Sequence, residues 1–232
     1  MKVAIIPARG GSKRIPRKNI KLFCGKPMLA YAIETAKSSR LFDRIIVSTE
    51  DEAIAAVANQ YGAETPFMRS QALADDFTNT HAVLVDAIKQ LTAMGDKPTA
   101  VCCLYATTPF LQAKYLQEGY EKLMQHNSSF AFSVTTFPFP VQRAIRITEN
   151  ERVEALHPEN NFVRSQDLEE VYHDAGQFYW GTVEAFLAER VIFSQASVPV
   201  ILPRHLVQDI DTPEDWVRAG YMYKAMQLQD NE

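Results

Sequence analysis

The residues best suited to chemistry form a glycine-rich, basic loop close to the N terminus. The loop spans residues 8–19 and follows a short apolar run. Gly10 and Gly11 let the backbone approach a ligand closely, and successive N–H groups in such a turn can hold phosphate oxygens. Arg9 and Lys18 bracket the glycines and can neutralise a triphosphate. The loop matches neither the Walker motif nor the dinucleotide-binding glycine motif. We therefore expect an anion site of another type, with a solvated basic loop as the alternative.

A second candidate lies far along the chain, in the acidic segment Asp209-Ile210-Asp211. Residues two apart on an extended segment point to the same side, so both carboxylates can face one cation. Mg²⁺ suits such a pair, because it is held by a few carboxylates together with phosphate oxygens and water. The next residues also fit a helix start, with Thr212 as the cap and Pro213 at the first position. Both interpretations can hold, and beside a phosphate-binding loop the pair predicts a metal site.

Charge is distributed unevenly along the 232 residues. Residues 1–33 contain eight Lys or Arg and no acidic residue, whereas the rest contain 16 basic and 28 acidic residues. One basic segment on an acidic body indicates a focused anion site rather than a surface for nucleic acid. The histidines form no HxxxH pair and the three cysteines no CxxC pair, so we expect neither zinc nor a disulfide framework. No apolar run reaches the length of a membrane span or signal peptide, which predicts a cytoplasmic protein.

Strands and helices are expected to alternate through most of the chain. Apolar runs predict strands at 2–7, 44–48, 101–104, 130–134, 177–180 and 198–202. Helices are predicted to begin near residues 27, 51, 78–80 and 212. This order is typical of a doubly wound α/β fold with a mostly parallel sheet. Ligands in such folds lie at the carboxyl ends of the strands, so the loops after the first four strands should carry the site.

Residues 137–172 interrupt the alternation. Pro138 and Pro140 exclude interior sheet, because proline lacks the N–H that a strand ladder needs. The stretch 141–153 alternates loosely between apolar and polar residues and could form a hairpin. We expect one domain over 1–232, with 137–172 as a small insertion that either covers the site or pairs subunits.

Several motifs together resemble the CMP-sugar synthetases, the cytidylyltransferases of sialic acid and other nine-carbon acidic sugars. They are Ile5-Ile6-Pro7-Ala8-Arg9-Gly10-Gly11-Ser12-Lys13 with Ile15-Pro16 and Lys18-Asn19, then Ile46-Val47-Ser48-Thr49, Thr107-Thr108-Pro109 and Asp209-Ile210-Asp211-Thr212. The motifs extend over nearly the whole chain, and their combination is specific although each alone is weak. The resemblance implies a Rossmann-like nucleotidyltransferase fold of the nucleotide-diphospho-sugar transferase type.

For the nucleotide, the resemblance implies CTP and assigns three groups of residues. Arg9 and Lys18 would contact the phosphates with Ala8, Gly10, Gly11 and Ser12 alongside, Asn19, Arg69 and Thr80 would hold the cytidine, and Asp209 and Asp211 would hold Mg²⁺. Arg9, Lys18 and Asp211 are the expected catalytic residues. The choice of CTP over UTP rests on the resemblance alone.

On the sugar side, the sequence departs from the sialic acid enzymes. Tyr105-Ala106 stands where those enzymes usually have Gln-Pro, and His173 stands where an arginine is usual. The segment from His173 to Phe178 resembles the branch that acts on pseudaminic acid, a bacterial sugar of flagellar and surface glycans. The residues expected at the sugar are Tyr105, Arg164, His173, Gln177 and Tyr179, with Arg164 supplied by the insertion.

The predicted reaction transfers CMP from CTP to the anomeric hydroxyl of a nine-carbon acidic sugar, pseudaminic acid, and releases pyrophosphate. Catalysis would consist of positioning and charge neutralisation. N-acetylneuraminic or legionaminic acid is the alternative within this class. A non-catalytic nucleotide- or RNA-binding module is the alternative outside it. The resemblance also implies a homodimer in which 137–172 crosses to the partner, and we expect neither nucleic acid nor membrane as partner.

Overall fold

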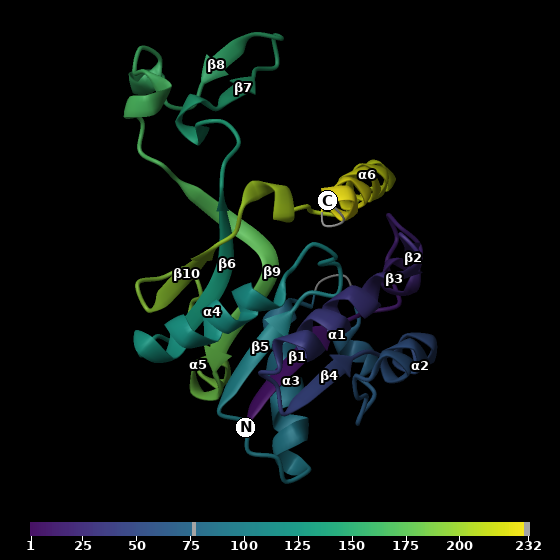
Figure 1. Cartoon of the computed structure of the whole chain (residues 1–232). Coiled ribbons are helices and arrows are strands. Elements are labelled where there is room, and N and C mark those ends of the chain that lie inside the picture. Colours follow the sequence, from purple (N-terminus) through teal and green to yellow (C-terminus); the bar gives the residue numbers. More distant parts are fainter. Residues whose placement is uncertain (76–77, 230–232) are drawn as a thin grey trace.

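A six-stranded sheet with helices on both faces forms the body of the protein (Figure 1), in a computed structural model that describes residues 1–75 and 78–229. The strands lie in the order β10-β6-β9-β5-β1-β4. They are β1 Lys2–Pro7, β4 Arg44–Ser48, β5 Ala100–Leu104, β6 Phe130–Thr136, β9 Tyr172–Thr182 and β10 Ser197–Ile201. Pairing is parallel except at β9, which runs antiparallel to β5 and β6. The predicted doubly wound, mostly parallel sheet is confirmed.

The helices divide between the two faces of this sheet. They are α1 Met28–Ser39, α2 Glu52–Tyr61, α3 Thr80–Ala93, α4 Ala113–Gln125, α5 Val183–Leu187 and α6 Pro213–Gln229, with a short hairpin of β2 Leu22–Phe23 and β3 Lys26–Pro27 before α1. In β1, Ala4 and Ile6 pack with α1, α2, α4 and α6, whereas Val3 and Ile5 pack with α3 and α5. All four side chains are fully buried. β1 is therefore a central strand covered on both faces, and a ligand is expected at its carboxyl end.

β9 differs most from the sequence-based expectation. It begins at Tyr172 and so includes the last residue assigned to the insertion. Its register with β6 shifts, because Phe132 pairs with Tyr179 while Val134 pairs with Asp174, and the extra residues of β9 form a bulge. Gly176 lies in this bulge with φ of +61°, a conformation that favours glycine. The bulge meets the carboxyl end of β5, so it shapes the edge where ligands are expected.

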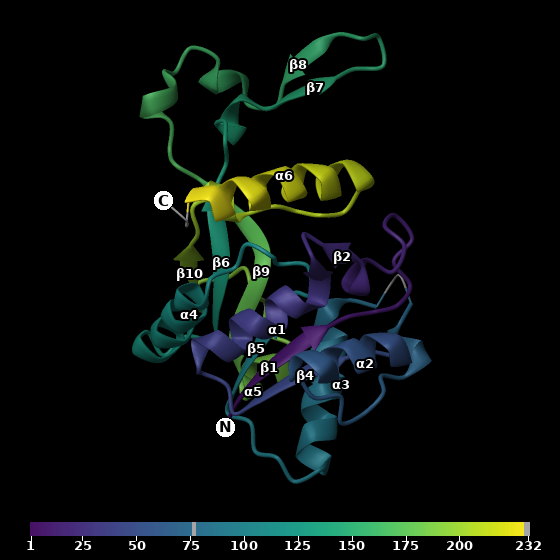
Figure 2. The same ribbon diagram turned by 45° about the vertical axis from the view of Figure 1, so that its right-hand side comes forward.

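The insertion rises from β6 and β9 away from the sheet (Figures 1 and 2). It contains a hairpin of β7 Ile145–Ile147 and β8 Val153–Ala155, near the stretch where the sequence suggested one. Its large apolar side chains include Phe139, Ile147 and Phe162, which are 81%, 76% and 99% exposed. Within residues 1–75 and 78–229, no helix is long and apolar enough to cross a bilayer. Among the described residues of the single chain, no other segment covers these large apolar side chains of the insertion, and they are exposed to solvent.

Candidate active site

The glycine-rich loop is fixed by the residues that directly follow β4. The Gly10 N–H donates to Glu50 Oε1 at 2.6 Å. Farther along the loop, Arg17 makes a two-point ion pair with Asp51 at 2.9 and 3.0 Å. Asp51 also caps α2, accepting two backbone N–H groups of that helix. These contacts hold the loop at the carboxyl ends of β1 and β4, where the fold places its ligands.

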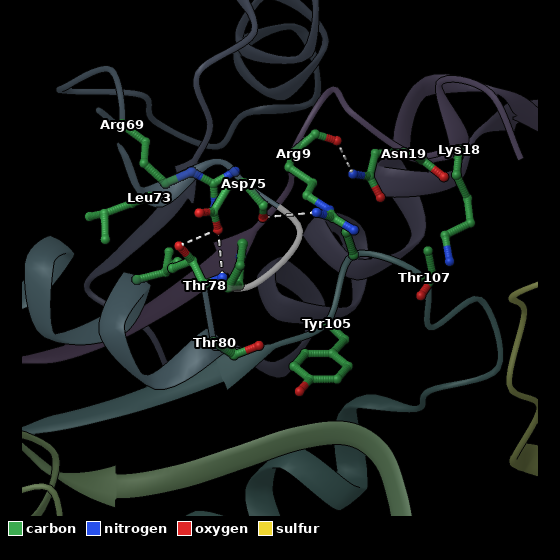
Figure 3. Close-up of a pocket in the computed structure, with 14 residues that line it drawn as sticks. Arg9, Lys18, Asn19, Arg69, Leu73, Asp75, Thr78, Thr80, Tyr105 and Thr107 are labelled. Carbon is green, nitrogen blue, oxygen red and sulfur yellow. Dashed lines mark hydrogen bonds between the residues drawn. The ribbon is translucent and has the colours of Figure 1, made fainter. Parts of the chain in front are cut away.

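A cavity of about 300 Å³ opens over this loop (Figure 3). Its lining includes Arg9, Ser12, Lys18, Asn19, Arg69 and Thr80 from the predicted nucleotide set. Figure 3 shows Arg9, Lys18 and Asn19 on one side and Arg69 on the other. Asn19 Nδ2 donates to the carbonyl of Arg9 at 2.9 Å. Three cations and several polar groups thus converge on one space, an arrangement that can hold a nucleoside triphosphate.

The remaining members of the nucleotide set do not line this cavity. Ala8 is 1% exposed, and its N–H donates to the Ser48 carbonyl at 3.0 Å. The Gly10 N–H already donates to Glu50, and a Cβ added at Gly11 would meet no atom within 4 Å. These three residues belong to the loop's framework, and the flanking side chains supply the lining.

A second cavity, of about 630 Å³, adjoins the first. Tyr105 and Thr107 line both cavities and form their common wall. Asp209 and Asp211 both line the second cavity, in agreement with the geometry expected from their spacing. The structure therefore sets a space in which cationic side chains outnumber carboxylates directly beside a space in which carboxylates outnumber cations.

The two carboxylates have different electrostatic surroundings. Burial, followed by the charge of Asp211, raises the pKa of Asp209. Burial also acts to raise the pKa of Asp211, but Lys18 and Arg14 outweigh it and leave that pKa below its usual value. Lys18 Nζ donates to Asp211 Oδ1 at 3.1 Å, and Arg14 donates to Oδ2 at 2.6 Å. Burial and the neighbouring carboxylate thus both disfavour the charged form of Asp209, whereas the two cations favour the charged form of Asp211.

This donor set fits a divalent cation whose coordination is completed by a ligand. Carboxylate oxygens are the donors that Mg²⁺ prefers, and Asp209 and Asp211 both line the second cavity. Among the residues described by the structure, no group of three or more His, Cys, Asp or Glu is arranged to hold a metal. The other ligands of such an ion would be phosphate oxygens and water, which is usual for Mg²⁺.

The chain can be assigned to a protein family by comparison with known proteins. A protein-family model described as Cytidylyltransferase matches residues 3–228. The chain belongs to the cytidylyltransferase family. Because this is a family of enzymes, the non-catalytic binding module considered from the sequence is set aside.

Individual relatives of this cytidylyltransferase include enzymes named for pseudaminic acid and for a legionaminic acid. It is 48% identical to the pseudaminic acid cytidylyltransferase of Campylobacter jejuni, over 96% of each chain. It is 31% identical to the CMP-N,N'-diacetyllegionaminic acid synthase of Legionella pneumophila, over 92% of each chain. Among solved structures, CMP:2-keto-3-deoxy-manno-octonic acid synthetase complexed with CTP matches with a TM-score of 0.69 over 99% of both chains, at 16% identity. This likeness confirms the nucleotidyltransferase type of fold.

Three of the five predicted sugar residues of the cytidylyltransferase line the second cavity. They are Tyr105, His173 and Tyr179. The rings of Tyr105 and Tyr179 lie 5.5 Å apart. Burial raises the pKa of both phenols, so both hydroxyls stay protonated at neutral pH and can donate hydrogen bonds.

The other two predicted sugar residues, Gln177 and Arg164, do not line this cavity. Gln177 lies on the bulge of β9 and turns inward, where its Nε2 donates to the carbonyl of Leu206 at 2.5 Å. Its backbone carbonyl accepts the N–H of Tyr105 at 2.9 Å, so Gln177 supports the cavity wall from behind. Arg164 lies on the insertion, which rises away from the sheet, and its exposed side chain pairs with Asp167 at 2.7 Å. Within one protomer, Arg164 is therefore not part of the site.

Asp174 is a cavity residue that sequence reasoning did not single out. Its carboxylate lines the second cavity and accepts the hydroxyl of Tyr179 and the N–H of Gly176. Asp174 thereby fixes the direction of the Tyr179 phenol. Its position beside His173 in the segment that resembles the pseudaminic branch was the available signal. Asp75 and Thr78, which line the first cavity, carried no such signal, because they lie in an irregular stretch before α3.

The glycine loop provides a matched test of this geometry. A Cβ added at Gly10 would lie 2.6 Å from Asp51 Oδ2, whereas one at Gly11 meets nothing within 4 Å. Overpacking of this kind costs about 1–3 kcal/mol, so Gly10→Ala should raise the KM for CTP about tenfold. Steady-state kinetics should show a smaller rise for Gly11→Ala. An equal rise in both variants would contradict the proposed fixing of the loop at Gly10.

The contact between Arg17 and Asp51 predicts a pH-dependent contribution to stability. The hydrogen bonds from Arg17, assisted by those from the first turn of α2, hold the pKa of Asp51 below its usual value. A lowered pKa stabilises the fold above the unfolded-state pKa, and this stabilisation is lost as the pH falls through the folded-state value. Asp51→Ala should therefore lower the free energy of unfolding at pH 7 by about 1–2 kcal/mol. Urea unfolding should show this deficit shrinking below about pH 4, and a deficit that is constant with pH would contradict the assignment.

Proposed function

We propose that this cytidylyltransferase transfers the CMP group of CTP to the anomeric hydroxyl of pseudaminic acid and releases pyrophosphate. The observation that carries the proposal is the common wall of Tyr105 and Thr107, which sets a cation-lined cavity beside a carboxylate-lined one. A triphosphate suits the first cavity and a hydroxyl-rich sugar the second, so their reacting atoms would meet at this wall. The 48% identity to the Campylobacter jejuni enzyme supports pseudaminic acid as the sugar.

The reaction forms a bond between the anomeric oxygen and the α-phosphorus while the bond from the α-phosphorus to the pyrophosphate oxygen breaks. The sugar hydroxyl is itself the nucleophile, so no covalent enzyme intermediate is needed. Its proton would pass to Asp211 or to water. Arg9 and Lys18 would stabilise the charge that grows on the departing pyrophosphate. Catalysis on this scheme consists of holding two substrates in line and neutralising charge.

We infer that Asp209 and Asp211 hold Mg²⁺ together with phosphate oxygens of CTP. When bound, the ion would supply Lewis-acid charge to the phosphates. Asp211 also accepts a hydrogen bond from Lys18, and Lys18 lines the nucleotide cavity. The position of the metal site and that of the phosphate site are thus linked through one side-chain contact.

The second cavity offers His173 and Arg218 to the carboxylate of an acidic sugar. The Nδ1 of His173 lies 2.8 Å from the carbonyl of Asp174 and can donate to it, which leaves Nε2 for a ligand. The ring of His173 packs edge-on against Phe137 at 4.8 Å. His173 is therefore oriented from two sides, as a residue that selects among similar sugars should be.

Product analysis tests the proposed reaction. Incubation with CTP, MgCl₂ and pseudaminic acid should yield CMP-pseudaminic acid, identified by its mass and by a single phosphodiester signal in the phosphorus NMR spectrum. Legionaminic and N-acetylneuraminic acids should react more slowly. Preferred conversion of legionaminic acid would instead assign the enzyme to the reaction named for the Legionella pneumophila relative.

We also propose that the enzyme is a homodimer in which the insertion contacts the partner. The exposed side chains of Phe139, Ile147 and Phe162 on this extension support the proposal, since large apolar side chains gain free energy when a partner removes them from water. Contact with a partner would also offer Arg164 a role that it lacks within one protomer. Size-exclusion chromatography with light scattering should give about twice the 26.2 kDa chain mass. A clean monomer at micromolar concentration would contradict the dimer.

A further inference from the structure

Glu50 is a largely buried carboxylate to which the proposed reaction assigns no role. It lies between β4 and α2, and its side chain is 10% exposed, against 3% for that of Arg69. Its Oε1 accepts the Gly10 N–H at 2.6 Å, and its Oε2 accepts Arg69 Nη2 at 2.5 Å. One carboxylate therefore joins the glycine loop to a residue of the nucleotide cavity. Hydrogen bonds to a charged group are among the stronger ones in proteins, so this link is rigid.

Arg69 retains hydrogen-bonding capacity beyond this contact. Its backbone N–H donates to the Thr49 carbonyl at 2.8 Å, which ties its segment to the end of β4. The side-chain Nε is buried and has no hydrogen-bond partner among the described residues. An unpaired buried donor costs free energy, and Arg69 lines the nucleotide cavity. The guanidinium is thus held in place with donors that its protein partner does not use.

A guanidinium in a fixed position can distinguish pyrimidine bases. Arginine offers only donors. Cytosine presents two adjacent acceptors, O2 and N3, whereas uracil carries a hydrogen on N3. A fixed guanidinium facing this edge would match cytosine and meet an opposing donor in uracil. A loosely held guanidinium could turn away from that donor and would discriminate less.

We propose that Glu50 is a positioning residue that fixes Arg69 for recognition of the cytosine edge and ties it to the loop that binds the triphosphate. The base and the phosphates of CTP are then held in a fixed position relative to each other, which places the α-phosphorus at the wall between the two cavities. The inference rests on the proposed use of CTP and deepens it, because it assigns a physical basis to the choice of CTP over UTP.

Ligand titrations test the role of Glu50 without a sugar or turnover. Isothermal titration calorimetry would measure CTP, UTP and inorganic tripolyphosphate against the wild type and Glu50→Gln. Glutamine keeps an acceptor for Gly10 but turns an amide toward Arg69. We expect CTP affinity to fall about tenfold or more, UTP and tripolyphosphate affinities to change by less than about threefold, and the CTP preference to shrink accordingly. Glu52→Gln, at an exposed glutamate two residues away in the first turn of α2, is the matched control and should behave as the wild type.

A double-mutant cycle separates positioning from a merely structural role. If Glu50 acts through Arg69, Glu50→Gln should weaken CTP binding no further in an Arg69→Met background. Equal losses for CTP and tripolyphosphate, or additive losses in the double variant, would overturn the proposal. Should Glu50→Gln fail to fold, Glu50→Asp carries the same expectations, because it shortens the reach to Arg69. Absence of pyrophosphate release with every sugar would count against the proposed function, while these titrations would still decide the role of Glu50.

Discussion

Replacing Asp211 with asparagine is expected to reduce kcat about 10²- to 10³-fold while the protein stays folded. Asp211 is the one carboxylate of the acidic segment that contacts both Lys18 and Arg14. The variant keeps the shape of the side chain but removes the charge that those cations, and the proposed Mg²⁺, would share. Pyrophosphate release at saturating CTP and sugar measures the loss, and circular dichroism checks the fold.

The matched control for this prediction is Glu214→Gln. Glu214 lies three residues away in the first turn of α6 and is exposed. Its substitution changes the local net charge by the same amount, so a general electrostatic effect would appear in both variants. Retention of more than about a tenth of the wild-type kcat by Asp211→Asn, with unchanged Mg²⁺ dependence, would contradict the assignment of Asp211.

Replacing Lys18 with methionine should have the second large effect, a fall in kcat/KM of about 10²- to 10³-fold. The Nζ of Lys18 donates to the Ile210 carbonyl at 2.8 Å and to Asp211, and the side chain lines the nucleotide cavity. Methionine keeps much of the length and apolar character but removes the charge. We expect both a higher KM for CTP and a lower kcat, because the phosphates lose a cation in the ground state and in the transition state.

Lys97→Met provides the comparison for Lys18→Met. Lys97 is exposed in the connection that enters β5, at the end of the sheet opposite the site. Steady-state kinetics should therefore leave this variant within about twofold of the wild type, a change worth well under 1 kcal/mol. A loss in Lys18→Met confined to KM would remove Lys18 from the catalytic step and leave it only a binding role.

The glycine-rich loop and the acidic segment could be found from the sequence because each is defined by residues that are neighbours in the chain. The loop combines glycines with flanking cations, and Asp209 and Asp211 have the spacing that turns two carboxylates the same way. Their meeting also follows from topology, since a doubly wound fold gathers the loops at the carboxyl ends of its strands. Lys18 and Ile210 are thus hydrogen-bonded although 192 residues separate them in the chain.

The other features of the site depend on how strands pair and where segments pack in the tertiary structure, which the periodicity of the sequence does not encode. The bulge of β9 decides that Gln177 turns inward while His173 and Tyr179 line the cavity. The direction in which the insertion leaves the sheet decides that Arg164 lies outside the site of its own protomer. Glu50 had no signature at all, because a single carboxylate after a strand is equally typical of a helix start.

The central claim is tested most directly by measuring Mg²⁺-dependent pyrophosphate release from CTP with pseudaminic, N-acetylneuraminic, legionaminic and 3-deoxy-octulosonic acids offered separately. We predict that pseudaminic acid gives the fastest release, and that chelation of the metal stops the reaction until Mg²⁺ is restored. Preference for N-acetylneuraminic acid would place the enzyme in the sialic acid branch and remove the specificity roles given to Tyr105 and His173. If folded protein that still binds CTP released no pyrophosphate with any of the four sugars, this result would contradict the proposed reaction itself.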